Sequence, residues 1–570
     1  MFILNNHQRL VMKILAIVPA RGNSKGIRRK NLRLFNGKPL VSYVISTLKK
    51  VSNIDDIVVT SEDDEILNYC LSLGVKVHKR PSLLSSDDVT LDPVVYEAYN
   101  WYRSKFGEVD CVLTVQPTSP LISENTIESA IRKFLEGDVD TIISVIDDTH
   151  LSWRKIGEEY FPEFTERLNR QYLSKRLRET GAFLITKSSF VTSKNRIGNK
   201  LYFFEVPPEE SLDIDETLDW LIGETLANRL KILIVTFGNK SVGTGHFSRT
   251  LSLADAFLGH DVEFALVDSG DIFSELLQFY GYSYKKVKLG EVKSLIRGGN
   301  FNLVINDILD TTREYMEGIK ELGVFVVNFE DLGEGSKLAN IVFNDMYGGF
   351  EIPDNYRVGY KYAVLNENFL VQPPNSFSEV VKNVLISFGG VDQNNLTFKT
   401  LSSIKDLIKQ RDISVKIIVG SLYSHFEELK DFISTFNLSS YVSVLHNVKN
   451  MASEMNGVDL GFTSNGRTVY ELASMRIPVI SIAQNDRETL HLFARTNPGV
   501  KYLGIACTVS EASIRETFVH LLDNTAKRKL MYNSLPYKEI RDGLLNVKEE
   551  IIFNYRRWRK NDYKTREENY

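Results

Sequence analysis

Short runs of apolar, often β-branched residues alternate with amphipathic stretches along almost the whole chain. The run KILAIVPA at 13–20, for example, is followed by the amphipathic stretch KPLVSYVISTLKK at 38–50. Strands that are apolar on both faces and are separated by helices are typical of a parallel sheet covered on both sides. The pattern therefore predicts an α/β fold. Its first five strands are expected at 13–20, 55–61, 75–80, 110–117 and 140–146.

The alternation loosens in the middle of the chain, where added strands are expected at 181–187 and 201–207, and starts again at 231–238. A polar stretch that contains Pro-Pro, at 365–381, separates this second series from a third and indicates a hinge. A chain of 570 residues is also too long for one hydrophobic core. We therefore expect one α/β domain followed by two Rossmann-like lobes with a ligand in the cleft between them. The expected domains are 1–229, 230–372 and 373–570.

Composition narrows the class of partner. The formal net charge of −4 and the pI of about 6.2 show no excess of positive charge of the kind that non-specific nucleic-acid binding requires. Three isolated cysteines indicate neither a disulfide framework nor a zinc ribbon and suit a reducing compartment. No apolar stretch approaches the roughly 18 residues of a membrane-spanning helix, and the run at 13–20 leads straight into a loop motif, unlike a signal peptide. We expect a cytoplasmic protein that binds neither nucleic acid nor membrane.

The first expected strand runs into the loop VPARGNSKGIRRKN at 18–31, which gathers five cations around Gly22 and Gly26. Glycines let a backbone approach a phosphate closely, and cations offset the phosphate charge. The spacing matches neither a Walker A loop nor G-x-G-x-x-G. The loop is therefore either a phosphate site or an exposed basic turn.

Two aspartates lie far along the chain in SLDIDETLDW. Asp213 and Asp215 alternate around Ile214, so on an extended segment both side chains point the same way. Paired carboxylates repel unless a cation joins them, and oxygen ligands of this kind suit Mg²⁺ bridging a triphosphate. The other interpretation makes Asp215 the N-cap of the following helix. The two roles are compatible.

A second glycine loop, VTFGNKSVGTGHFSRTLSLADAF at 235–257, follows the strand at 231–238. His246 is expected at the N-terminus of the next helix, where the positive helix end keeps the imidazole neutral, as a general base requires. Arg249 lies one turn further along the same face. The alternative is a partly exposed capping histidine.

Two more glycine turns occur in the third series. In GFTSNGRTVYELASMRIPVISI at 461–482, a glycine loop precedes a helix that bears Glu471. Backbone N–H groups of residues 464–468 could hold a diphosphate and Glu471 could accept both ribose hydroxyls; otherwise Glu471 is a solvent-facing helix residue. The turn ISFGGVDQNN at 386–395 either lines the cleft or is a plain strand-to-helix turn.

Five segments occur in the order and spacing of the CMP-sialic acid synthetase family: IVPARGNSKGIRRKNLRLFNGKPL, RPSLLSSD, LTVQPTSPL, NRQYLSKRLRETGAFLIT and SLDIDETLDW. That family contains the cytidylyltransferases for sialic, pseudaminic and legionaminic acids, and the resemblance covers about residues 12–228. It implies a Rossmann-like, GT-A-like nucleotidyltransferase domain that forms a homo-oligomer. It also implies attack by the anomeric hydroxyl of a nine-carbon 2-keto acid on the α-phosphate of CTP, giving a CMP-sugar and pyrophosphate.

Residue roles follow from this resemblance by position. CTP is expected to contact Arg21, Ser24, Lys25, Lys30, Asn31 and Arg80. Catalytic roles fall on Arg21 and Lys25, which with Lys30 face the triphosphate. The sugar acid is expected to contact Gln116 and, through its carboxylate, Arg170. The Mg²⁺ ligands are expected to be Asp213 and Asp215.

The chain departs from this family near the expected sugar acid. Thr180 stands where many members have asparagine, and Trp153 and Arg154 stand where some place a lysine. Both positions bear on the acid that is accepted. The resemblance therefore predicts the reaction and leaves the particular nonulosonic acid open.

The segments VGTGHFSRTLSLADAF, ISFGGVD and TSNGRTVYELA resemble the UDP-sugar hydrolase of pseudaminic acid biosynthesis and related predicted spore-coat glycosyltransferases, over about 230–500. The resemblance implies a GT-B-like fold and attack of water at the anomeric carbon of a UDP-linked 2,4-diacetamido-2,4,6-trideoxyhexose. His246 falls on the catalytic base. The expected UDP-sugar contacts are Gly245, Arg249, Gly389, Asn465, Gly466, Thr468, Glu471 and Asn485.

Two departures concern this second resemblance. Asp486 replaces an amide next to the nucleotide, with Asn485 retained, and Ile308 after Asp307 stands where the hydrolase has a ring-bearing residue. A different sugar, or an acceptor other than water, would account for both. The sequence thus predicts a bifunctional enzyme of nonulosonic acid biosynthesis. It leaves open a glycosyltransferase, or a non-catalytic nucleotide-sugar-binding module, in the second part.

Overall fold

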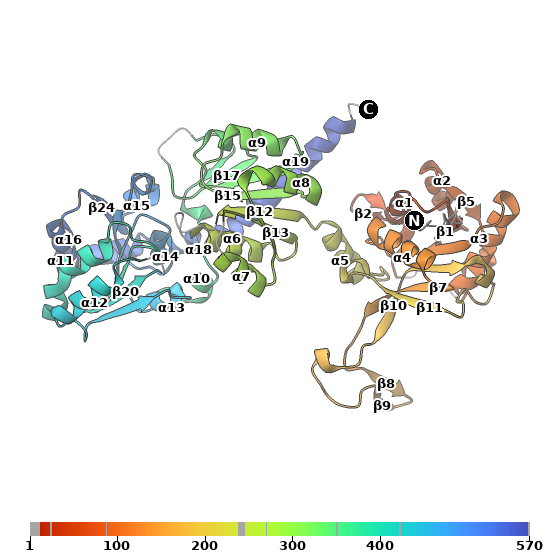
Figure 1. The fold of residues 1–570 in the computed structure, drawn as a ribbon, viewed down its shortest axis with the longest axis horizontal. Coiled ribbons are helices and arrows are strands. Elements are labelled where there is room, and N and C mark those ends of the chain that lie inside the picture. Colours follow the sequence, from red (N-terminus) through yellow and green to blue (C-terminus); the bar gives the residue numbers. More distant parts are fainter. Residues whose placement is uncertain are drawn as a thin grey trace, which may run out of the picture. The chain divides into compact units, whose positions relative to one another are not determined.

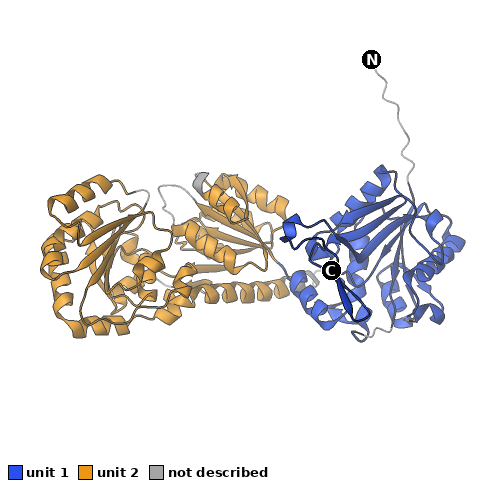
Figure 2. Cartoon of the chain, turned by 90° about the horizontal axis from the view of Figure 1, so that it is seen from below, with its two compact units in different colours: residues 1–229 blue, residues 230–570 orange. Residues whose placement is uncertain are grey.

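The computed structural model describes residues 12–22, 26–86, 88–237, 245–268, 271–348, 352–420 and 423–567. The chain forms two compact units, Met1–Arg229 and Leu230–Tyr570, which Figure 2 colours separately. Each unit is built from predominantly parallel sheets covered by helices (Figure 1). The predicted α/β class, with one α/β domain followed by two Rossmann-type lobes, is confirmed.

The first unit contains a seven-stranded sheet in the order β11-β7-β10-β6-β1-β4-β5. Its strands are β1 (Ile14–Pro19), β4 (Asp56–Ser61), β5 (Lys76–Lys79), β6 (Cys111–Val115), β7 (Thr141–Asp147), β10 (Leu177–Lys187) and β11 (Leu201–Glu205). All neighbours are parallel except β10, which runs antiparallel between β6 and β7. The sequence predicted a parallel sheet here, and this inserted strand is the exception to it.

Apolar residues on both faces of β1 explain why this sheet is covered twice. Ile14, Ala16 and Val18 pack into one core. Leu15 and Ile17 pack into another core on the opposite face. The covering helices are α1 (Leu40–Leu48), α2 (Asp64–Ser72), α3 (Leu91–Phe106) and α4 (Glu124–Glu136), and α5 (Thr217–Ala227) ends the unit.

A hairpin stands apart from this sheet (Figure 1). Strands β8 (Trp153–Ile156) and β9 (Glu159–Pro162) pair antiparallel, and every residue of both is exposed. We call residues 151–177, which include the hairpin and the chain that returns to β10, the arm. The sequence did not predict these strands, because their residues do not alternate around a buried face. A second small hairpin joins β2 (Leu34–Phe35) and β3 (Lys38–Pro39).

The first lobe of the second unit has a fully parallel sheet in the order β14-β13-β12-β15-β16-β17-β18. The strands are β12 (Lys231–Phe237), β13 (Asp261–Val267), β14 (Ser283–Val287), β15 (Leu303–Asp307), β16 (Phe325–Phe329), β17 (Ile341–Asn344) and β18 (Tyr356–Val358). The helices are α6 (Gly245–Ala256), α7 (Asp271–Phe279), α8 (Val292–Gly299) and α9 (Arg313–Lys320). Short helix α10 (Asn368–Val371) follows in the predicted hinge.

The second lobe has a parallel six-stranded sheet in the order β21-β20-β19-β22-β23-β24. The strands are β19 (Asn383–Ser387), β20 (Ser414–Val419), β21 (Val442–His446), β22 (Leu460–Thr463), β23 (Val479–Ala483) and β24 (Val500–Ile505). The helices are α11 (Leu396–Gln410), α12 (Phe426–Thr435), α13 (Met451–Met455), α14 (Thr468–Ser474), α15 (Leu492–Thr496), α16 (Glu511–Asp523), α17 (Thr525–Asn533) and α18 (Tyr537–Arg541).

The last helix, α19 (Gly543–Glu567), returns to the first lobe. Val547, Ile551 and Tyr555 are buried in the same core as β12, and Tyr555 meets the ring of Phe325 edge-on. The range 373–570, assigned from the sequence to the second lobe, therefore includes a segment that packs with the first lobe. Contacts of this kind depend on the tertiary fold and leave no local sequence signal.

In each large sheet the strand order reverses beside the first strand. Strand β1 lies between β4 and β6, β12 between β13 and β15, and β19 between β20 and β22. Open α/β sheets bind ligands at the carboxyl ends of the strands beside such a reversal. The loops at 18–31, 235–257 and 386–395 follow β1, β12 and β19 respectively. The topology therefore places each of these loops where a ligand site is expected.

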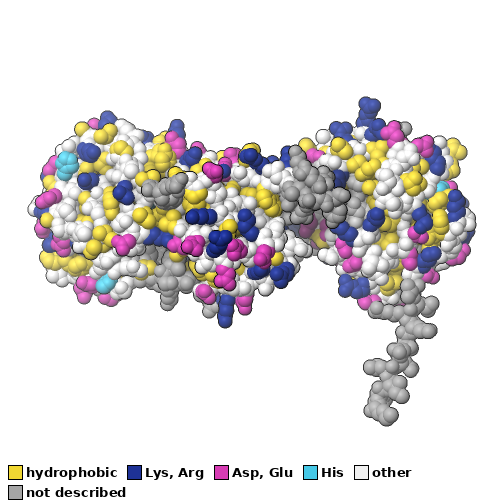
Figure 3. All heavy atoms as spheres, turned by 90° about the horizontal axis from the view of Figure 1, so that it is seen from above, with side chains coloured by type: hydrophobic (Ala, Val, Ile, Leu, Met, Phe, Trp, Pro, Cys, Tyr) yellow, Lys and Arg dark blue, Asp and Glu magenta, His cyan; other side chains and the backbone are white. Residues whose placement is uncertain are grey.

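Charges of both signs are interspersed over the face of the molecule that Figure 3 draws. This agrees with the formal net charge of −4. Among the described residues, no helix is long and apolar enough to cross a membrane.

Candidate functional site

The loop after β1 is held by acidic residues at the sheet edge. The N–H of Gly22 donates to Glu62 Oε1 at 2.7 Å. A Cβ at Gly26 would collide with the carbonyl oxygen of Asp215, so only glycine permits this approach. The end of the cation-rich loop thus lies against the distant aspartate segment. Ser24 and Lys25 lie outside the described residues.

The two aspartates flank a residue that packs into the core, as the alternation along the segment predicts. Ile214 is fully buried between them, in a cluster with Phe35 and Trp220. Lys30 Nζ donates to the carbonyl oxygen of Ile214 at 2.6 Å and to Asp215 Oδ1 at 3.0 Å. The N-cap of α5 is Glu216, which forms a capping box with Asp219. Asp215 is therefore not the N-cap of α5.

Asp213 is the most unusual of these residues. Its Oδ1 is buried without a hydrogen-bond partner in the described structure. Burial, and then the charge of Asp215, raises the pKa of Asp213 above its ordinary value. Gln116 Nε2 donates to the carbonyl oxygen of Gly181 at 2.8 Å, and a Cβ at Gly181 would lie 3.6 Å from Asp213 Oδ2. Gln116, Gly181 and Asp213 therefore lie together in one cluster.

A bulge in strand β10 brings these three residues together. Its register against β7 shifts between Glu179 and Leu184, and Gly181 has a φ of 73°, in the left-handed region that glycine accepts readily. Thr180, beside it, is buried and donates to Ser144 Oγ at 2.8 Å. Thr180 thus supports the bulge from behind instead of facing the site.

The carboxylate pair fits a hard divalent cation. A buried, partnerless oxygen on Asp213 beside a second carboxylate is the donor chemistry that Mg²⁺ prefers, with phosphate oxygens completing its shell. No group of three or more His, Cys, Asp or Glu that could hold a metal occurs in the part of the chain that the structure describes. Asp213 and Asp215 would supply two oxygen ligands to such a cation.

Two further predicted CTP contacts support the loop. Arg80 is buried and pairs with Glu62 Oε2 at 2.7 Å, the carboxylate that also holds Gly22. Asn31 Nδ2 donates to the carbonyl oxygen of Arg21 at 2.8 Å, and its Oδ1 is buried without a partner in the described structure. Both side chains therefore hold the loop in place, Arg80 through Glu62 and Asn31 through the backbone of Arg21.

The predicted site residues of the arm do not bond to the cluster of Gln116, Gly181 and Asp213. Arg170 is exposed in the short helix η3 (Arg170–Tyr172), and no hydrogen bond of the described residues joins it to Gln116 or Asp213. Arg154 pairs with Glu163 within the arm, at 2.7 Å.

The second unit contains a cavity of about 630 Å³ between its lobes. His246 and all eight residues that the sequence assigned to a UDP-sugar line this cavity. The lining includes the start of α6, which follows β12 in the chain, and residues at or just beyond the carboxyl ends of β15, β19 and β22, beside the reversal of strand order in each sheet. One cavity thus gathers loops that are more than 200 residues apart in sequence.

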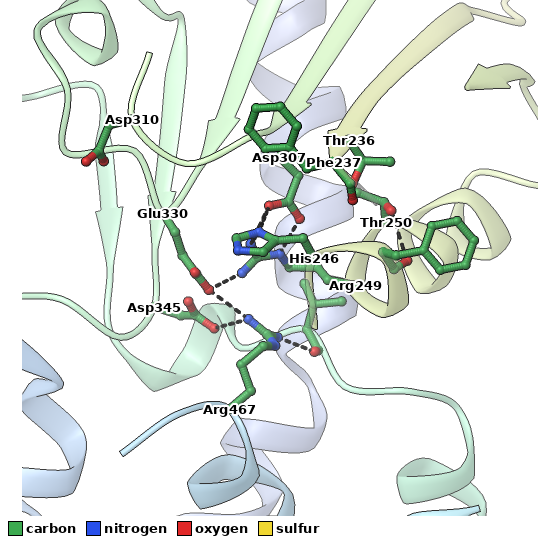
Figure 4. A network of polar contacts seen from close by, with 12 residues as sticks. Thr236, Phe237, His246, Arg249, Thr250, Asp307, Asp310, Glu330, Asp345 and Arg467 are labelled. Carbon is green, nitrogen blue, oxygen red and sulfur yellow. Dashed lines mark hydrogen bonds and ion pairs between the residues drawn. The ribbon is translucent and has the colours of Figure 1, made fainter. Parts of the chain in front are cut away.

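His246 is paired with a buried carboxylate (Figure 4). Its Nδ1 lies 2.5 Å from Oδ1 of Asp307, the last residue of β15. The histidine lies in the first turn of α6, and its side chain is only 11% exposed. Nη2 of Arg249 lies 3.1 Å from the same Nδ1. In a neutral ring that carries its proton on Nδ1, toward the closer carboxylate, Nε2 is able to accept a proton. His246 is therefore nearly buried, paired with a carboxylate and at the cavity wall, and is not a partly exposed residue.

Arg249 keeps this carboxylate ionised. It donates to both oxygens of Asp307, from Nε and Nη2, each at 2.6 Å, and its Nη1 contacts Glu330. Burial alone would raise the pKa of Asp307, but the charge of Arg249 and the hydrogen bonds from Arg249 and His246 outweigh burial and hold it well below its ordinary value. Asp307 is a partner that sequence reasoning missed.

Four more charged residues of this network, Glu330 among them, were also missed. Arg467 and Arg487 extend from the second lobe to the first: Arg467 Nη1 lies 3.0 Å from Glu330 Oε1, and Arg487 Nη2 donates to the carbonyl oxygen of Glu330 at 2.7 Å. Asp345 Oδ2 lies 3.4 Å from Arg467 Nη1. A signal was present, because the ends of β15, β16 and β17 each carry asparagine followed within two residues by an acid.

The second lobe supplies the other wall of the cavity. Glu471 is partly buried and lines the cavity, and burial raises its pKa, so it is not a solvent-facing helix residue. Gly389 has a φ of 85° and open space where a Cβ would lie. Asn485 Oδ1 accepts the N–H of Glu488 at 3.0 Å.

Both departures from the hydrolase pattern can now be placed. Asp486 is exposed and is not among the described residues that line the cavity. Ile308 is buried in the core beneath the sheet, and Leu309 lines the cavity instead. Leu309 has a φ of 62°, which is unusual for a residue with a branched side chain. The cavity lining therefore includes an aliphatic side chain two residues after Asp307.

Comparison with known proteins matches the N-terminal part of the chain to cytidylyltransferases. The model of the cytidylyltransferase family matches residues 15–211. The N-acylneuraminate cytidylyltransferase A of Danio rerio is 30% identical over 219 residues, which cover 37% of this chain and 50% of that protein. The chain thus spans about half the length of several curated relatives that it matches. The crystal structure of MurG from Acinetobacter baumannii covers 56% of this chain and 99% of its own, with a TM-score of 0.41 and 14% identity.

A shorter relative is matched almost throughout. The pseudaminic acid cytidylyltransferase of Campylobacter jejuni is 31% identical over 221 residues, which cover 36% of this chain and 93% of that protein. The match agrees with the five segments singled out in the sequence and with the loop and carboxylate pair that the first unit brings together. Through its N-terminal unit, the chain belongs to the cytidylyltransferase family.

Proposed function

We propose that the first unit transfers CMP from CTP to the anomeric hydroxyl of a nonulosonic acid and releases pyrophosphate. The observation that carries this proposal is the buried, partnerless Oδ1 of Asp213 beside Asp215, at the end of a cation-rich loop. Relatives named as pseudaminic acid and N-acylneuraminate cytidylyltransferases support the choice of substrate.

Each side chain has a defined task in this reaction. When bound at Asp213 and Asp215, Mg²⁺ would offset charge on the triphosphate and its departing pyrophosphate. Arg21 and Lys30 add positive charge beside the phosphates. One N–H of Gln116 Nε2 is committed to Gly181, and its Oε1 would accept a hydrogen bond from the attacking hydroxyl and so orient it.

Pyrophosphate release tests this assignment. With CTP, Mg²⁺ and a panel of nonulosonic acids, we expect wild type to release pyrophosphate and Asp213→Asn to lose most of that activity. Asp138→Asn is the matched control, because Asp138 is exposed and pairs with Lys200 away from the site. Near-normal release by Asp213→Asn would rule out its proposed role.

For the second unit we propose hydrolysis of a UDP-linked 2,4-diacetamido-2,4,6-trideoxyhexose. The observation that carries it is the His246–Asp307 pair at the cavity wall. His246 Nε2 takes a proton from water as the water oxygen bonds to the anomeric carbon. The bond from that carbon to the diphosphate oxygen breaks, and its electron pair leaves with UDP.

Release of UDP from the UDP-sugar alone distinguishes the candidate activities. We expect release by wild type and by His520→Ala, an exposed histidine outside the cavity, but not by His246→Ala. Release that requires an added sugar acceptor would assign transfer instead of hydrolysis. Tight binding without turnover would assign a non-catalytic binding module.

We also propose that the first unit self-associates through its arm. Several large apolar side chains of the arm are exposed, namely Trp153, Ile156, Tyr160, Phe161, Leu168 and Tyr172. Trp153 and Tyr160 share one face of the hairpin, and Ile156 and Phe161 share the other. Exposed apolar side chains of this kind occur in protein–protein contacts, and a second copy of the chain would cover them.

A further inference from the structure

Arg467 joins the two lobes of the second unit (Figure 4). It directly precedes α14, in the loop at 464–468 that receives the leaving diphosphate under the proposed function. Its guanidinium is directed to the first lobe. Nη1 lies 3.0 Å from Glu330 Oε1 and Nη2 donates to the carbonyl oxygen of Val364 at 2.5 Å. Both terminal nitrogens are therefore engaged by protein groups of the other lobe.

Glu330 connects this arginine to a second one. Its Oε1 accepts from Arg467 Nη1 and from Arg249 Nη1, and its side chain is 4% exposed. Burial raises the pKa of Glu330, but the two arginines outweigh burial and lower it, so the carboxylate stays charged. Its backbone φ of 52° is costly for a residue with a Cβ. Strain of this kind persists where the surrounding contacts fix it, often at functional sites.

The series of ion pairs continues to the base. Arg249 is 1% exposed and contacts both Glu330 and Asp307. Asp307 in turn holds His246 Nδ1. A buried ionic series thus runs from Arg467 through Glu330, Arg249 and Asp307 to His246.

We propose that Arg467 is a positioning residue that sets the orientation of His246 relative to the loop at 464–468. It acts through Glu330, Arg249 and Asp307, and it fixes the spacing of the two lobes across the cavity. The base and the site of the leaving group lie on different lobes, so their separation must be held for water to attack opposite the departing diphosphate. This inference rests on the proposed function of the second unit.

The kinetic test compares Arg467→Gln and Arg467→Lys with wild type. Arg495→Gln is the matched control, because Arg495 is exposed on α15 and donates to Thr489 within its own lobe. For Arg467→Gln we expect kcat for UDP release to fall by roughly 10–100-fold, with the Kd for UDP within about threefold of wild type. Arg467→Lys keeps the positive charge but lacks the planar guanidinium that donates from two terminal nitrogens, so partial recovery of kcat is expected.

Two kinetic outcomes would overturn the proposal. An unchanged kcat in Arg467→Gln would show that the base does not depend on the ion pair. A large rise in the Kd for UDP with little loss of kcat at saturation would show that Arg467 binds the nucleotide directly. Thermal unfolding of each variant distinguishes these effects from a failure to fold.

Amide hydrogen exchange in the presence of UDP does not require turnover, so it tests this proposal independently of the hydrolase proposal. We expect UDP, bound in the second lobe, to slow amide hydrogen exchange at residues 325–332 of the first lobe in wild type and Arg495→Gln. Arg467→Gln loses that protection while keeping it around Glu471. If wild type releases no UDP, the hydrolase proposal fails, yet this exchange pattern still supports the link. Equal protection of 325–332 in Arg467→Gln would refute the link whatever the turnover.

Discussion

Replacing Asp307 with asparagine removes one charge from the buried network of the second unit. Asp307 is completely buried and accepts two hydrogen bonds from Arg249 at 2.6 Å and one from His246 at 2.5 Å. Breaking a buried ion pair by removing one partner costs about 3–5 kcal/mol. At about 2 °C per kcal/mol for a large unit, the unfolding midpoint of this unit is expected to fall by roughly 6–10 °C.

The same substitution changes the base. An asparagine can present an N–H to His246 Nδ1, which favours the ring with its proton on Nε2, and a protonated Nε2 cannot accept a proton from water. We expect kcat for UDP release to fall by up to about 10⁴-fold, the order of loss seen when the carboxylate partner of a catalytic histidine is neutralised. The assay is UDP release at saturating UDP-sugar, below the new unfolding midpoint.

Asp310→Asn provides the control. Asp310 lies three residues further on, is 47% exposed and pairs with Arg487. An exposed pair contributes about 0–1 kcal/mol, so a midpoint within about 2 °C of wild type is expected. If Asp307→Asn kept both its midpoint and its kcat, the assignment of Asp307 as the partner of the base would be refuted.

Three more outcomes are expected. A Cβ at Gly181 would lie 2.8 Å from Gln116 Nε2, so Gly181→Ala is expected to lower kcat/KM for pyrophosphate release by about 10-fold or more; unchanged kinetics would contradict the placement of Gln116. Burial lowers the pKa of His491 from 6.5 to about 4, so the folded state disfavours its proton, and stability is full above about pH 6.5 and falls by about 3 kcal/mol toward pH 4. Denaturant unfolding of His491→Gln at pH 7 and pH 4.5 checks this through a smaller pH dependence than wild type. Glutamate at Trp153 and Tyr160 is expected to shift sedimentation from oligomer to monomer, and an unchanged distribution would remove the arm as the interface.

Much of the fold is visible in the sequence because apolar strands and glycine loops are local signals. The strands at β1, β4, β6 and β12 coincide closely with the apolar runs that predicted them. The antiparallel direction of β10 was not visible, because an apolar run does not encode the direction of its strand. The return of α19 to the first lobe, and the exposed hairpin at β8 and β9, likewise depend on contacts or exposures that no local pattern carries.

The site was predictable where backbone geometry demands glycine. Gly26 and Gly389 mark places where a backbone approaches another segment closely or adopts a positive φ. Partners that depend on strand order were not predictable in the same way. Asp307 meets His246 because β15 lies next to β12 although 61 residues separate the two side chains.

Phosphorus NMR of one incubation with CTP, a nonulosonic acid, Mg²⁺ and the UDP-sugar tests most directly whether the chain carries two separate active sites. Wild type is predicted to form pyrophosphate from CTP and UDP from the UDP-sugar. Asp213→Asn is predicted to lose only the pyrophosphate signal and His246→Ala only the UDP signal. The account is contradicted if wild type forms no pyrophosphate, or if either variant loses both signals while remaining folded.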